Sequence, residues 1–469
     1  MCNGAIPHHK YGIAPFIISH YSDSMIQRTV EKRLRELLAY YPVVVLTGPR
    51  QSGKTTLLKC MFPDRKYFNL ENPSTLDLVS TDPTSFMQRH GTNVIVDEAQ
   101  RLPELFSYIQ ASVDDRRRNG RIILSGSQNV LLSDAISQTL AGRAAYCELL
   151  PLTQTELKSV GQQFAEPRPA RSKSERPGFA GSKPAGQTAD RSDATDLFGN
   201  IFMGSYPGQR SERIPPEIFF DQYIATYVER DVRAIRNVSD LATFRSFMRL
   251  LAGRIGQLLD YTSLANDAGV SPNTVKNWLS VLEASYLLKI LRPLHNNFGK
   301  RYIKSPKVYF LDTGLACRLL GIQHAKEIET HYLRGSLFEN FVVAELHKEI
   351  SSRNIDTEMF FYRDAKQNEV DLVLRSGLSE SVVEIKSASG FSASMLKGLH
   401  FWDKLLATRQ AGDAPCRASD LPRRTGDTSQ QASGVPQLAT RKFVVYAGKA
   451  TTVGGAQLLP WTDLGVLLG

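Results

Sequence analysis

Short apolar runs alternate with longer amphipathic stretches in the first third of the chain. The runs lie at residues 43–46, 66–70, 94–96, 121–124 and 144–149. Alternation of strand-length and helix-length segments predicts a parallel sheet with helices on its faces. We therefore expect a compact α/β unit over residues 25–158, with its first helix at 28–38. Met25 is then a candidate for the natural start, and residues 1–24 are expected to be a disordered extension.

Two stretches interrupt the globular pattern. Residues 159–196 and 408–440 are rich in Pro, Ser, Arg and Gly and poor in apolar residues. Such a composition cannot form a packed core, so both are predicted to be flexible insertions. Residues 197–325 carry mostly helical patterns. Residues 326–469 are predicted to form a second α/β domain, because strand-like runs return there at 359–362, 370–374, 382–385 and 443–446.

One loop carries the clearest chemistry. It joins the apolar run 43–46 to a helical stretch and matches the phosphate-loop pattern G-x-x-x-x-G-K-[ST] at residues 48–55. Backbone N–H groups of such a loop, with the helix N-terminus behind it, bind nucleotide phosphates. Lys54 would contact the β- and γ-phosphates of ATP, and the Thr55 hydroxyl would bind Mg²⁺. The predicted ATP-contacting residues are Gly48, Pro49, Arg50, Gln51, Ser52, Gly53, Lys54, Thr55 and Thr56.

Two later apolar runs end in residues suited to hydrolysis of that ATP. Asp97 and Glu98 follow the run 94–96. Asp97 would hold Mg²⁺ through its water shell, and Glu98 would orient or deprotonate the attacking water. Ser127 or Gln128 follows the next run and would lie between Glu98 and the γ-phosphate, because ligands of such sheets lie beyond the carboxyl ends of the strands. Ordinary acidic or polar turns are the alternative for both positions.

A fourth short segment supplies a candidate cation. Arg143 ends the sequence Leu-Ala-Gly-Arg at residues 140–143. It would stabilise the transferring phosphoryl group, either in its own chain or from a neighbouring subunit of a homo-oligomer. A surface arginine beside a glycine turn is the alternative.

These segments together resemble a family of bacterial and archaeal AAA-type ATPases in which a C-terminal domain of unknown function follows the ATPase. The resemblance rests on residues 47–56, 94–100, 124–127, 140–143 and 148–152, and on 227–232 and 309–315 for the second domain. It covers most of the chain from Met25 onward, apart from the two insertions. It implies a P-loop NTPase fold with Ser127 as a sensor residue and Arg143 as an arginine finger.

A helix-turn-helix pattern lies within residues 242–310. A short helix is predicted at 262–268, a turn at 269–271 and a second helix at 273–282, with Val275, Trp278, Leu279 and Leu282 on its apolar face. The opposite face carries Asn273, Lys276 and Asn277, which would reach the major groove of double-stranded DNA. Strands at 288–294 and 301–303 would add a wing whose cations suit phosphates: Lys300, Arg301, Lys304 and Lys307. The resemblance implies the winged-helix fold; packing or protein contact is the alternative use.

The C-terminal runs carry a group of charged residues. Asp371 lies in one strand-like run, and Glu384 and Lys386 lie on one side of the next. The two acids would bind Mg²⁺, Lys386 would stabilise charge or orient a water, and Glu339 would add a third ligand from the preceding helix. This order resembles the D…E-x-K signature of PD-(D/E)XK nucleases, with their restriction-endonuclease-like fold. A salt-bridged strand pair and an inactive fold kept for binding are the alternatives.

Bulk properties add little to this interpretation. The 469-residue chain has a formal charge of +10, which permits DNA binding but equally fits an inert basic surface. Its 5 cysteines form no C-x-x-C pair, and no apolar run reaches membrane-spanning length, so a cytoplasmic protein without membrane contact is expected. We expect ATP to control a DNA-engaging, nuclease-like C-terminal half. The alternative is an ATP-dependent regulator or protein-partner switch with an inactive nuclease-like fold.

Overall fold

The computed structural model describes residues 26–115, 117–127, 139–163, 196–228, 241–294, 305–412 and 439–469. Several sequence predictions fall outside these residues: the N-terminal extension 1–24 with Met25, most of the two insertions, Gln128, and the wing cations Lys300, Arg301 and Lys304. At the edges of the two predicted insertions, the structure has helix where flexible chain was expected. Helix α8 (Gln154–Gln163) and helix α19 (Lys397–Gly412) each continue into the segments that were predicted to be flexible.

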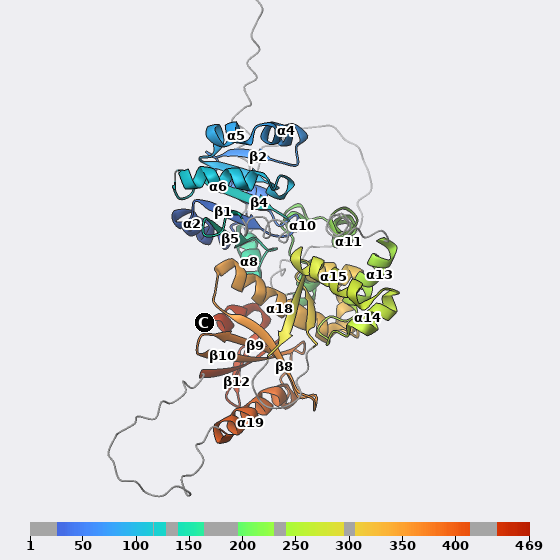
Figure 1. Cartoon of the computed structure of the whole chain (residues 1–469). Helices are drawn as coiled ribbons and strands as arrows, with labels where there is room; N and C mark the ends of the chain where they lie inside the picture. The colour runs from blue at the N-terminus through green and yellow to red at the C-terminus, as the bar shows by residue number, and fades with distance from the viewer. Residues whose placement is uncertain are drawn as a thin grey trace, which may run out of the picture.

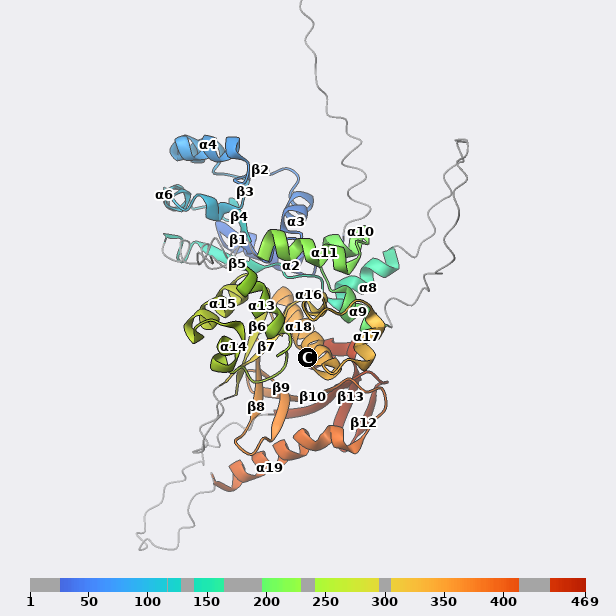
Figure 2. The same cartoon turned by 90° about the vertical axis from the view of Figure 1, so that its right-hand side faces the viewer.

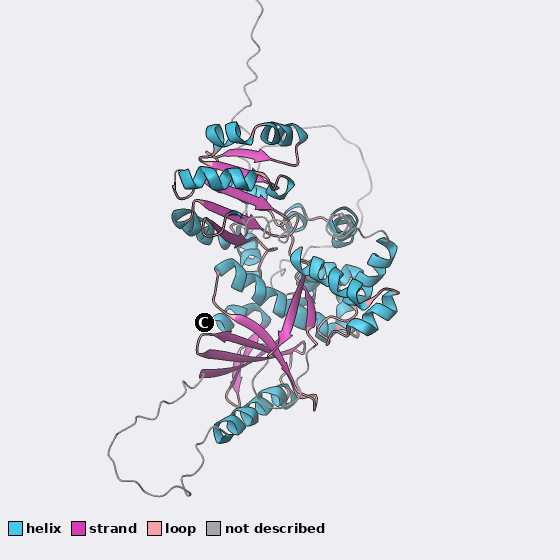
Figure 3. Ribbon diagram, in the orientation of Figure 1, coloured by secondary structure: helices cyan, strands magenta, loops and turns pink. Residues whose placement is uncertain are grey.

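Five parallel strands form the sheet of the N-terminal part (Figures 1 and 3). They are β1 (Val43–Thr47), β2 (Lys66–Asn69), β3 (Val94–Asp97), β4 (Ile122–Gly126) and β5 (Ala144–Glu148), in the order β2-β3-β4-β1-β5. The five predicted apolar runs and their parallel arrangement are thus confirmed. Polar side chains that end β1, β3, β4 and β5 therefore share one edge of the sheet.

Alternate residues of the central strands pack on opposite faces, as a strand period of two requires. One face is covered by α2 (Val30–Tyr40) and α3 (Lys54–Met61). The other is covered by α4 (Pro73–Thr81), α5 (Pro83–His90) and α6 (Leu105–Asp115). Because the strands are buried on both faces, they read as continuous apolar runs, which is typical of parallel sheets.

Helices dominate the middle of the chain. They are α9 (Leu197–Met203), α10 (Pro207–Glu212), α11 (Pro216–Tyr223), the π-helical turn η2 (Ile224–Val228), α13 (Leu241–Ala252), α14 (Tyr261–Ala268), α15 (Pro272–Ala284), α16 (Thr313–Leu319) and α17 (Ala325–Thr330). Asp260 caps α14, Gly269 ends it with a φ of +67°, and Ser271 caps α15. The predicted helix-turn-helix pair is therefore present in the structure.

A second, mixed sheet of eight strands forms the C-terminal part (Figure 3). Its order is β12-β13-β11-β10-β9-β8-β6-β7. The strands are β6 (Leu288–Pro293), β7 (Lys307–Phe310), β8 (Glu358–Arg363), β9 (Glu369–Ser376), β10 (Ser379–Lys386), β11 (Ala439–Tyr446), β12 (Thr451–Val453) and β13 (Ala456–Pro460). The partner of β6 is thus Lys307–Phe310, later in the chain than the predicted 301–303. Because β6 pairs with β8, the sheet also crosses the domain boundary predicted at 325/326.

Helix α18 (Arg334–Arg353) lies on one face of this sheet and α19 lies on the other (Figures 1 and 2). Helix α18 also contacts α2 of the N-terminal part, so it stands between the two sheets. Short helical turns complete the fold: η1 (Ala99–Arg101), η3 (Ala393–Leu396) and η4 (Trp461–Leu468). Among the described residues, no helix is long and apolar enough to cross a membrane.

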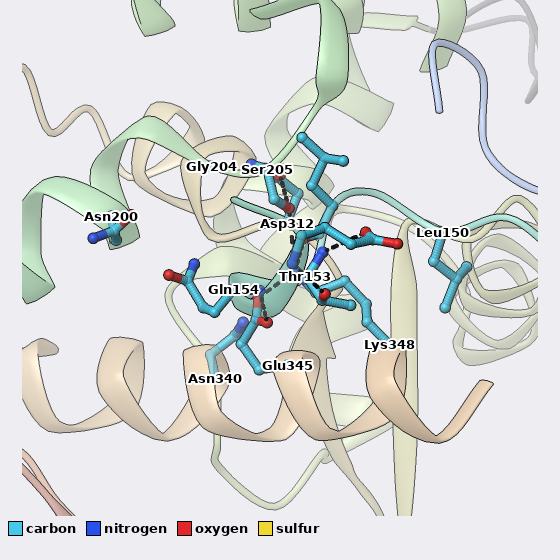
Figure 4. A network of polar contacts seen from close by, with 12 residues as sticks. Leu150, Thr153, Gln154, Asn200, Gly204, Ser205, Asp312, Asn340, Glu345 and Lys348 are labelled. Atoms are coloured by element: carbon cyan, nitrogen blue, oxygen red, sulfur yellow. Dashed lines mark hydrogen bonds and ion pairs between the residues drawn. The ribbon is translucent and has the colours of Figure 1, made fainter. Parts of the chain in front are cut away.

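Buried polar contacts join the two parts where the chain leaves β5 (Figure 4). Lys348 of α18 donates to the carbonyl of Leu152 at 2.8 Å and to Ser205 Oγ at 3.2 Å. Glu345, one turn earlier, pairs with Lys348 and accepts from the backbone N–H of Gln154 at 2.8 Å. Each charge has partners, which a charge in such a buried position requires.

Asn340, on the same helix, satisfies both backbone groups at the end of β7. Its side chain accepts from Phe310 N–H and donates to Phe310 C=O, each at 2.7 Å. The Asn340→Ala substitution should lower the free energy of unfolding by about 2–5 kcal/mol, because it leaves two buried backbone groups without partners. Urea denaturation would measure this, with the exposed Asn266→Ala as the control. An Asn340→Ala change no larger than that of the control would contradict the assignment.

Candidate nucleotide site and C-terminal carboxylate cluster

The loop after β1 takes a backbone that only glycine allows at one point. Gly48 has a φ of +151°, and a Cβ built there would lie 2.1 Å from the carbonyl oxygen of Leu149. Gly53, with a φ of +91°, stands directly before α3. The loop therefore wraps tightly at the carboxyl end of β1 and presents the N-terminus of α3, which is the arrangement that binds phosphate groups.

Lys54 lies inside this loop rather than in solvent. Its side chain is 7% exposed. The ammonium donates to the carbonyls of Gly48 at 2.9 Å and Pro49 at 2.8 Å. Phosphate oxygens placed in the loop would compete for the same ammonium, as the motif predicts.

Three hydroxyl groups surround the carboxylate of Asp97 at the end of β3. Thr55 Oγ1 donates to it at 2.7 Å, Tyr67 OH at 2.5 Å and Ser125 Oγ at 2.5 Å. Asp97 itself is 3% exposed. Thr55 and Asp97 thus supply adjacent oxygen atoms, the ligand type that Mg²⁺ prefers. The sequence predicted Thr55 and Asp97 at this site but not Tyr67, because the hydroxyl of a tyrosine in an apolar run carries no signal of its partner.

Glu98 follows Asp97 in a left-handed backbone, with a φ of +56°. Ser127 Oγ donates to its carboxylate at 3.3 Å, and Gln100 donates at 2.5 Å. Burial raises the pKa of Glu98, while the nearby cations Lys54 and Arg50 act in the opposite direction. The structure therefore brings Glu98 and Ser127 together beside the loop, as the pattern of strand ends indicated. A side chain with raised pKa in such a place suits proton transfer.

The position of Arg143 contradicts a role at the loop of its own chain. Its backbone carbonyl accepts from Val43 N–H, at the start of β1, whereas the loop follows the end of that strand. Five residues of strand separate the two ends by about 16 Å. Its guanidinium pairs with Asp114 at the end of α6, at 2.6 and 2.8 Å. The sequence alone could not reveal this position. Arg143 directly precedes β5, so it lies at the end of the sheet where β1 and β5 begin, away from the loop.

Side chains from outside the five-stranded sheet reach the loop and the end of β1 as well. Tyr286 OH contacts Thr47 Oγ1 at 2.7 Å, and Tyr227 OH accepts from Gln51 at 3.1 Å. Arg28 donates to the carbonyl of Ser52 at 2.9 Å. These contacts could not be predicted from the sequence, because no periodic pattern relates aromatic and basic residues that lie far apart in the chain.

A second group of charges lies where β9 and β10 separate. Their pairing ends at Val383 with Leu372. Beyond that point Asp371 enters the gap and accepts from Ile385 N–H at 2.8 Å. Lys386 Nζ lies 2.7 Å from Asp371 and 2.6 Å from Glu384. Burial, and then the charge of Asp371, raise the pKa of Glu384 to about 8. The three predicted residues Asp371, Glu384 and Lys386 thus converge.

Glu339 takes part in a neighbouring charge group instead. It accepts from Lys307 at 2.9 Å and from Tyr309 OH at 2.6 Å. Lys307, which is 1% exposed, also pairs with Glu369 at 2.6 Å. Lys307 is therefore not a surface cation of a wing, contrary to prediction. Within the described ranges, no three or more His, Cys, Asp or Glu side chains gather as a metal site, so this geometry gives the metal prediction for Glu339, Asp371 and Glu384 no support.

Helix α15 presents its two faces as its pattern predicted. Its four predicted apolar positions are buried: Val275, Trp278, Leu279 and Leu282. Asn273, Lys276 and Asn277 are exposed. Lys276 Nζ lies 5.5 Å from the centre of the Tyr261 ring, so part of its charge faces an aromatic surface. The other predicted DNA contacts, Lys300 and Arg301, lie outside the described residues.

The raised pKa of Glu98 gives a stability prediction with a definite sign. Ionisation of Glu98 costs more in the folded chain than in the unfolded chain. The cost is absent below the ordinary carboxyl pKa of 4.5 and grows as pH rises through the raised folded value. Glu98→Gln should therefore raise Tm over the wild type at pH 8 and leave it unchanged near pH 4. Thermal unfolding between pH 4 and pH 8 measures the difference in Tm between Glu98→Gln and the wild type, with the exposed Glu104→Gln as the control. A difference in Tm that becomes smaller toward pH 8 would contradict the prediction.

Three family models match consecutive parts of the chain. Residues 40–158 match the AAA domain, 194–326 match a domain of unknown function (DUF8612), and 334–460 match another domain of unknown function (DUF4143). The AAA match covers the five-stranded sheet and its loop. The N-terminal part therefore has the parallel-sheet α/β fold of P-loop ATPases.

Known proteins resemble the chain over most of its length. "Uncharacterized protein Rv2008c" of Mycobacterium tuberculosis is 30% identical over 370 residues, covering 78% of this chain and 75% of its own. "Uncharacterized protein MJ1544" of Methanocaldococcus jannaschii is 23% identical over 356 residues, covering 71% of this chain and 72% of its own. The solved structure of a Walker-type ATPase of Pyrococcus abyssi is 16% identical, with a TM-score of 0.38, and the match covers 63% of this chain and 96% of that one. The chain belongs to one family with the mycobacterial protein, as a member in which an AAA domain precedes two domains of unknown function.

Proposed function

We propose that the protein binds ATP at the loop of residues 48–55 and hydrolyses it with Mg²⁺. One observation carries the proposal: Lys54, Thr55, Asp97, Glu98 and Ser127 meet at one edge of the sheet. The loop and Lys54 bind the phosphates. Glu98, aided by Ser127, positions and deprotonates the attacking water.

The oxygen atoms of Thr55 and Asp97 fit Mg²⁺. They are 2.7 Å apart, and two further hydroxyl groups fix the carboxylate from its other sides. Mg²⁺ would supply positive charge for the β- and γ-phosphate oxygens. Residues 48–56 are our proposed ATP ligands, and Thr55 and Asp97 are our proposed Mg²⁺ ligands. Arg143 retains one proposed role, as a finger supplied to a neighbouring subunit of a homo-oligomer.

The first test separates binding from hydrolysis. Lys54→Ala should weaken ATP binding roughly 10- to 100-fold, because a hydrogen bond to a charged group contributes about 1.5–3 kcal/mol to the binding free energy. Glu98→Gln should retain ATP binding and lose about 100-fold or more in turnover. Titration calorimetry and phosphate release measure the two quantities, with the exposed Lys32→Ala as control. Unchanged ATP affinity in Lys54→Ala would contradict the proposed site.

For the C-terminal half we propose a DNA-engaging, nuclease-like role. In this proposal residues 242–310 form a winged helix and residues 326–469 form a PD-(D/E)XK-like domain. The separation of β9 and β10 supports it, because the gap holds two carboxylates and a lysine at one point. Two carboxylates and a lysine are the residue types that metal-assisted phosphodiester cleavage uses, so this proposal rests on Asp371 and Glu384 without Glu339. The alternative is a regulator or protein-partner switch that keeps the fold without cleavage, as the engagement of Glu339 with Lys307 favours.

Lysine substitutions distinguish these two functions. Wild type and the exposed control Lys366→Ala should cut labelled double-stranded DNA in Mg²⁺ or Mn²⁺, and Lys386→Ala should not, because its charge is needed beside Asp371 and Glu384. Gel electrophoresis of the labelled DNA is the measurement. Equal cutting by Lys386→Ala would place the activity elsewhere. Absence of cutting in the wild type would favour the non-cleaving switch.

A further inference from the structure

Arg50 crosses the edge of the sheet at which ATP is proposed to bind. It is the third residue of the loop after β1, and its Nη1 lies 3.6 Å from Glu71 Oε1. Glu71 follows the end of β2, and β4 and β3 stand between β1 and β2 in the sheet. Three strand spacings, about 14 Å, separate the two outer strands. The contact between Arg50 and Glu71 therefore spans the part of the sheet edge formed by β3 and β4, the strands that Glu98 and Ser127 follow.

The guanidinium is held in a site with little solvent. The Arg50 side chain is 12% exposed. Its charge lowers the pKa of Glu98, second only to Lys54 among the cations that do so, which places it close to that carboxylate. A cation in such a partly dry position acts on developing negative charge more strongly than one in water.

Two tyrosines from outside the ATPase sheet fix this segment of the loop. The ring of Tyr227 lies 5.7 Å from the Arg50 guanidinium carbon, and its hydroxyl accepts from Gln51 at 3.1 Å. Tyr223 OH donates to the backbone carbonyl of Arg50 at 3.4 Å. An aromatic face and a carboxylate thus orient the guanidinium.

We propose that Arg50 is a catalytic residue that stabilises the transferring phosphoryl group of ATP within its own chain, and that Tyr227 positions it. The inference rests on the proposed ATPase function. Water attacks the γ-phosphorus, and its proton passes to Glu98. The bond from the γ-phosphorus to the bridging oxygen breaks, and the electron pair leaves with ADP. Arg50 exchanges its contact with Glu71 for the γ-phosphoryl oxygens, on which charge is redistributed in the transition state.

The planar shape of the guanidinium matters to this role. Arginine offers five N–H donors in a fixed fork, whereas lysine is a compact point charge. A fork can contact two phosphoryl oxygens while its face remains on the Tyr227 ring. Arg143 lies at the opposite end of the strands, so a different residue of the same chain would have to supply this cation.

Arg50 substitutions test the proposal with Mg²⁺-ATP as the probe. Arg50→Ala should lower kcat about 100- to 1,000-fold and change ATP affinity less than about threefold, because the contact strengthens in the transition state. Arg50→Lys should not restore kcat. ADP with Mg²⁺ and aluminium fluoride mimics the transition state, so Arg50→Ala should also lose tight retention of that complex while still binding ADP. The exposed Arg89→Ala is the matched control.

Substitutions of Tyr227 test its positioning role. Tyr227→Leu removes the ring and should lower kcat more than ATP affinity, whereas Tyr227→Phe keeps the ring and should recover most of kcat. Equal kcat in wild type and Arg50→Ala would overturn the inference while leaving the ATPase proposal intact. A fall in ATP affinity alone would assign Arg50 to ground-state binding and also overturn it. A wild type that binds ATP but releases no phosphate would overturn both proposals.

Discussion

The contact between the loop after β1 and the exit of β5 is the constraint on which the molecule is built. Gly48 lies so close to the Leu149 carbonyl that no side chain fits between them. This contact shapes the phosphate-binding loop and also directs the chain after β5. Within the next few residues, Leu150 accepts from Arg28, Leu152 accepts from Lys348, and Gln154 donates to Glu345. The nucleotide site and the C-terminal half therefore share one short segment of backbone.

The sequence predicted those features that depend on residues close together in the chain or at the ends of neighbouring strands. The five strands of the first sheet, its loop, and the convergence of Glu98 with Ser127 follow from apolar runs and from the residues that end them. The helices α14 and α15 follow from caps and a glycine turn. In each case the relevant residues are neighbours in the chain or lie on neighbouring strands whose carboxyl ends must coincide.

Long-range pairing could not be predicted in the same way. Nothing in the sequence of β6 indicates that it joins β8, because strand patterns carry no label for their partner. A lysine also reads as an exposed cation until its partners are known. Lys307 is buried against Glu339 and Glu369, and its pKa is raised because their attraction outweighs the opposing effect of burial. Arg143 was assigned by motif, but motifs do not say at which end of a strand a residue lies in space.

Both charge groups hold a buried carboxylate at a cost in stability. Glu98 and Glu384 are carboxylates whose pKa is raised mainly by burial, and each has a lysine close by. Replacing such groups with apolar residues of similar size is often stabilising in proteins, so their presence points to a use beyond folding. The difference between them is in the backbone. Glu98 itself has a left-handed backbone directly after a strand, whereas Glu384 lies inside a strand next to a gap.

The pairing of β6 with β8 has a mechanical consequence for the C-terminal half. Leu294 N–H adds a bond of 2.7 Å to Phe361 C=O beside the two paired residues, so the helix pair α14–α15 and the carboxylate cluster sit on one continuous sheet. A hinge between them would have to break that edge. A rotation of this sheet would therefore turn both surfaces together. A ligand spanning the two would be moved as a whole, without being stretched between them.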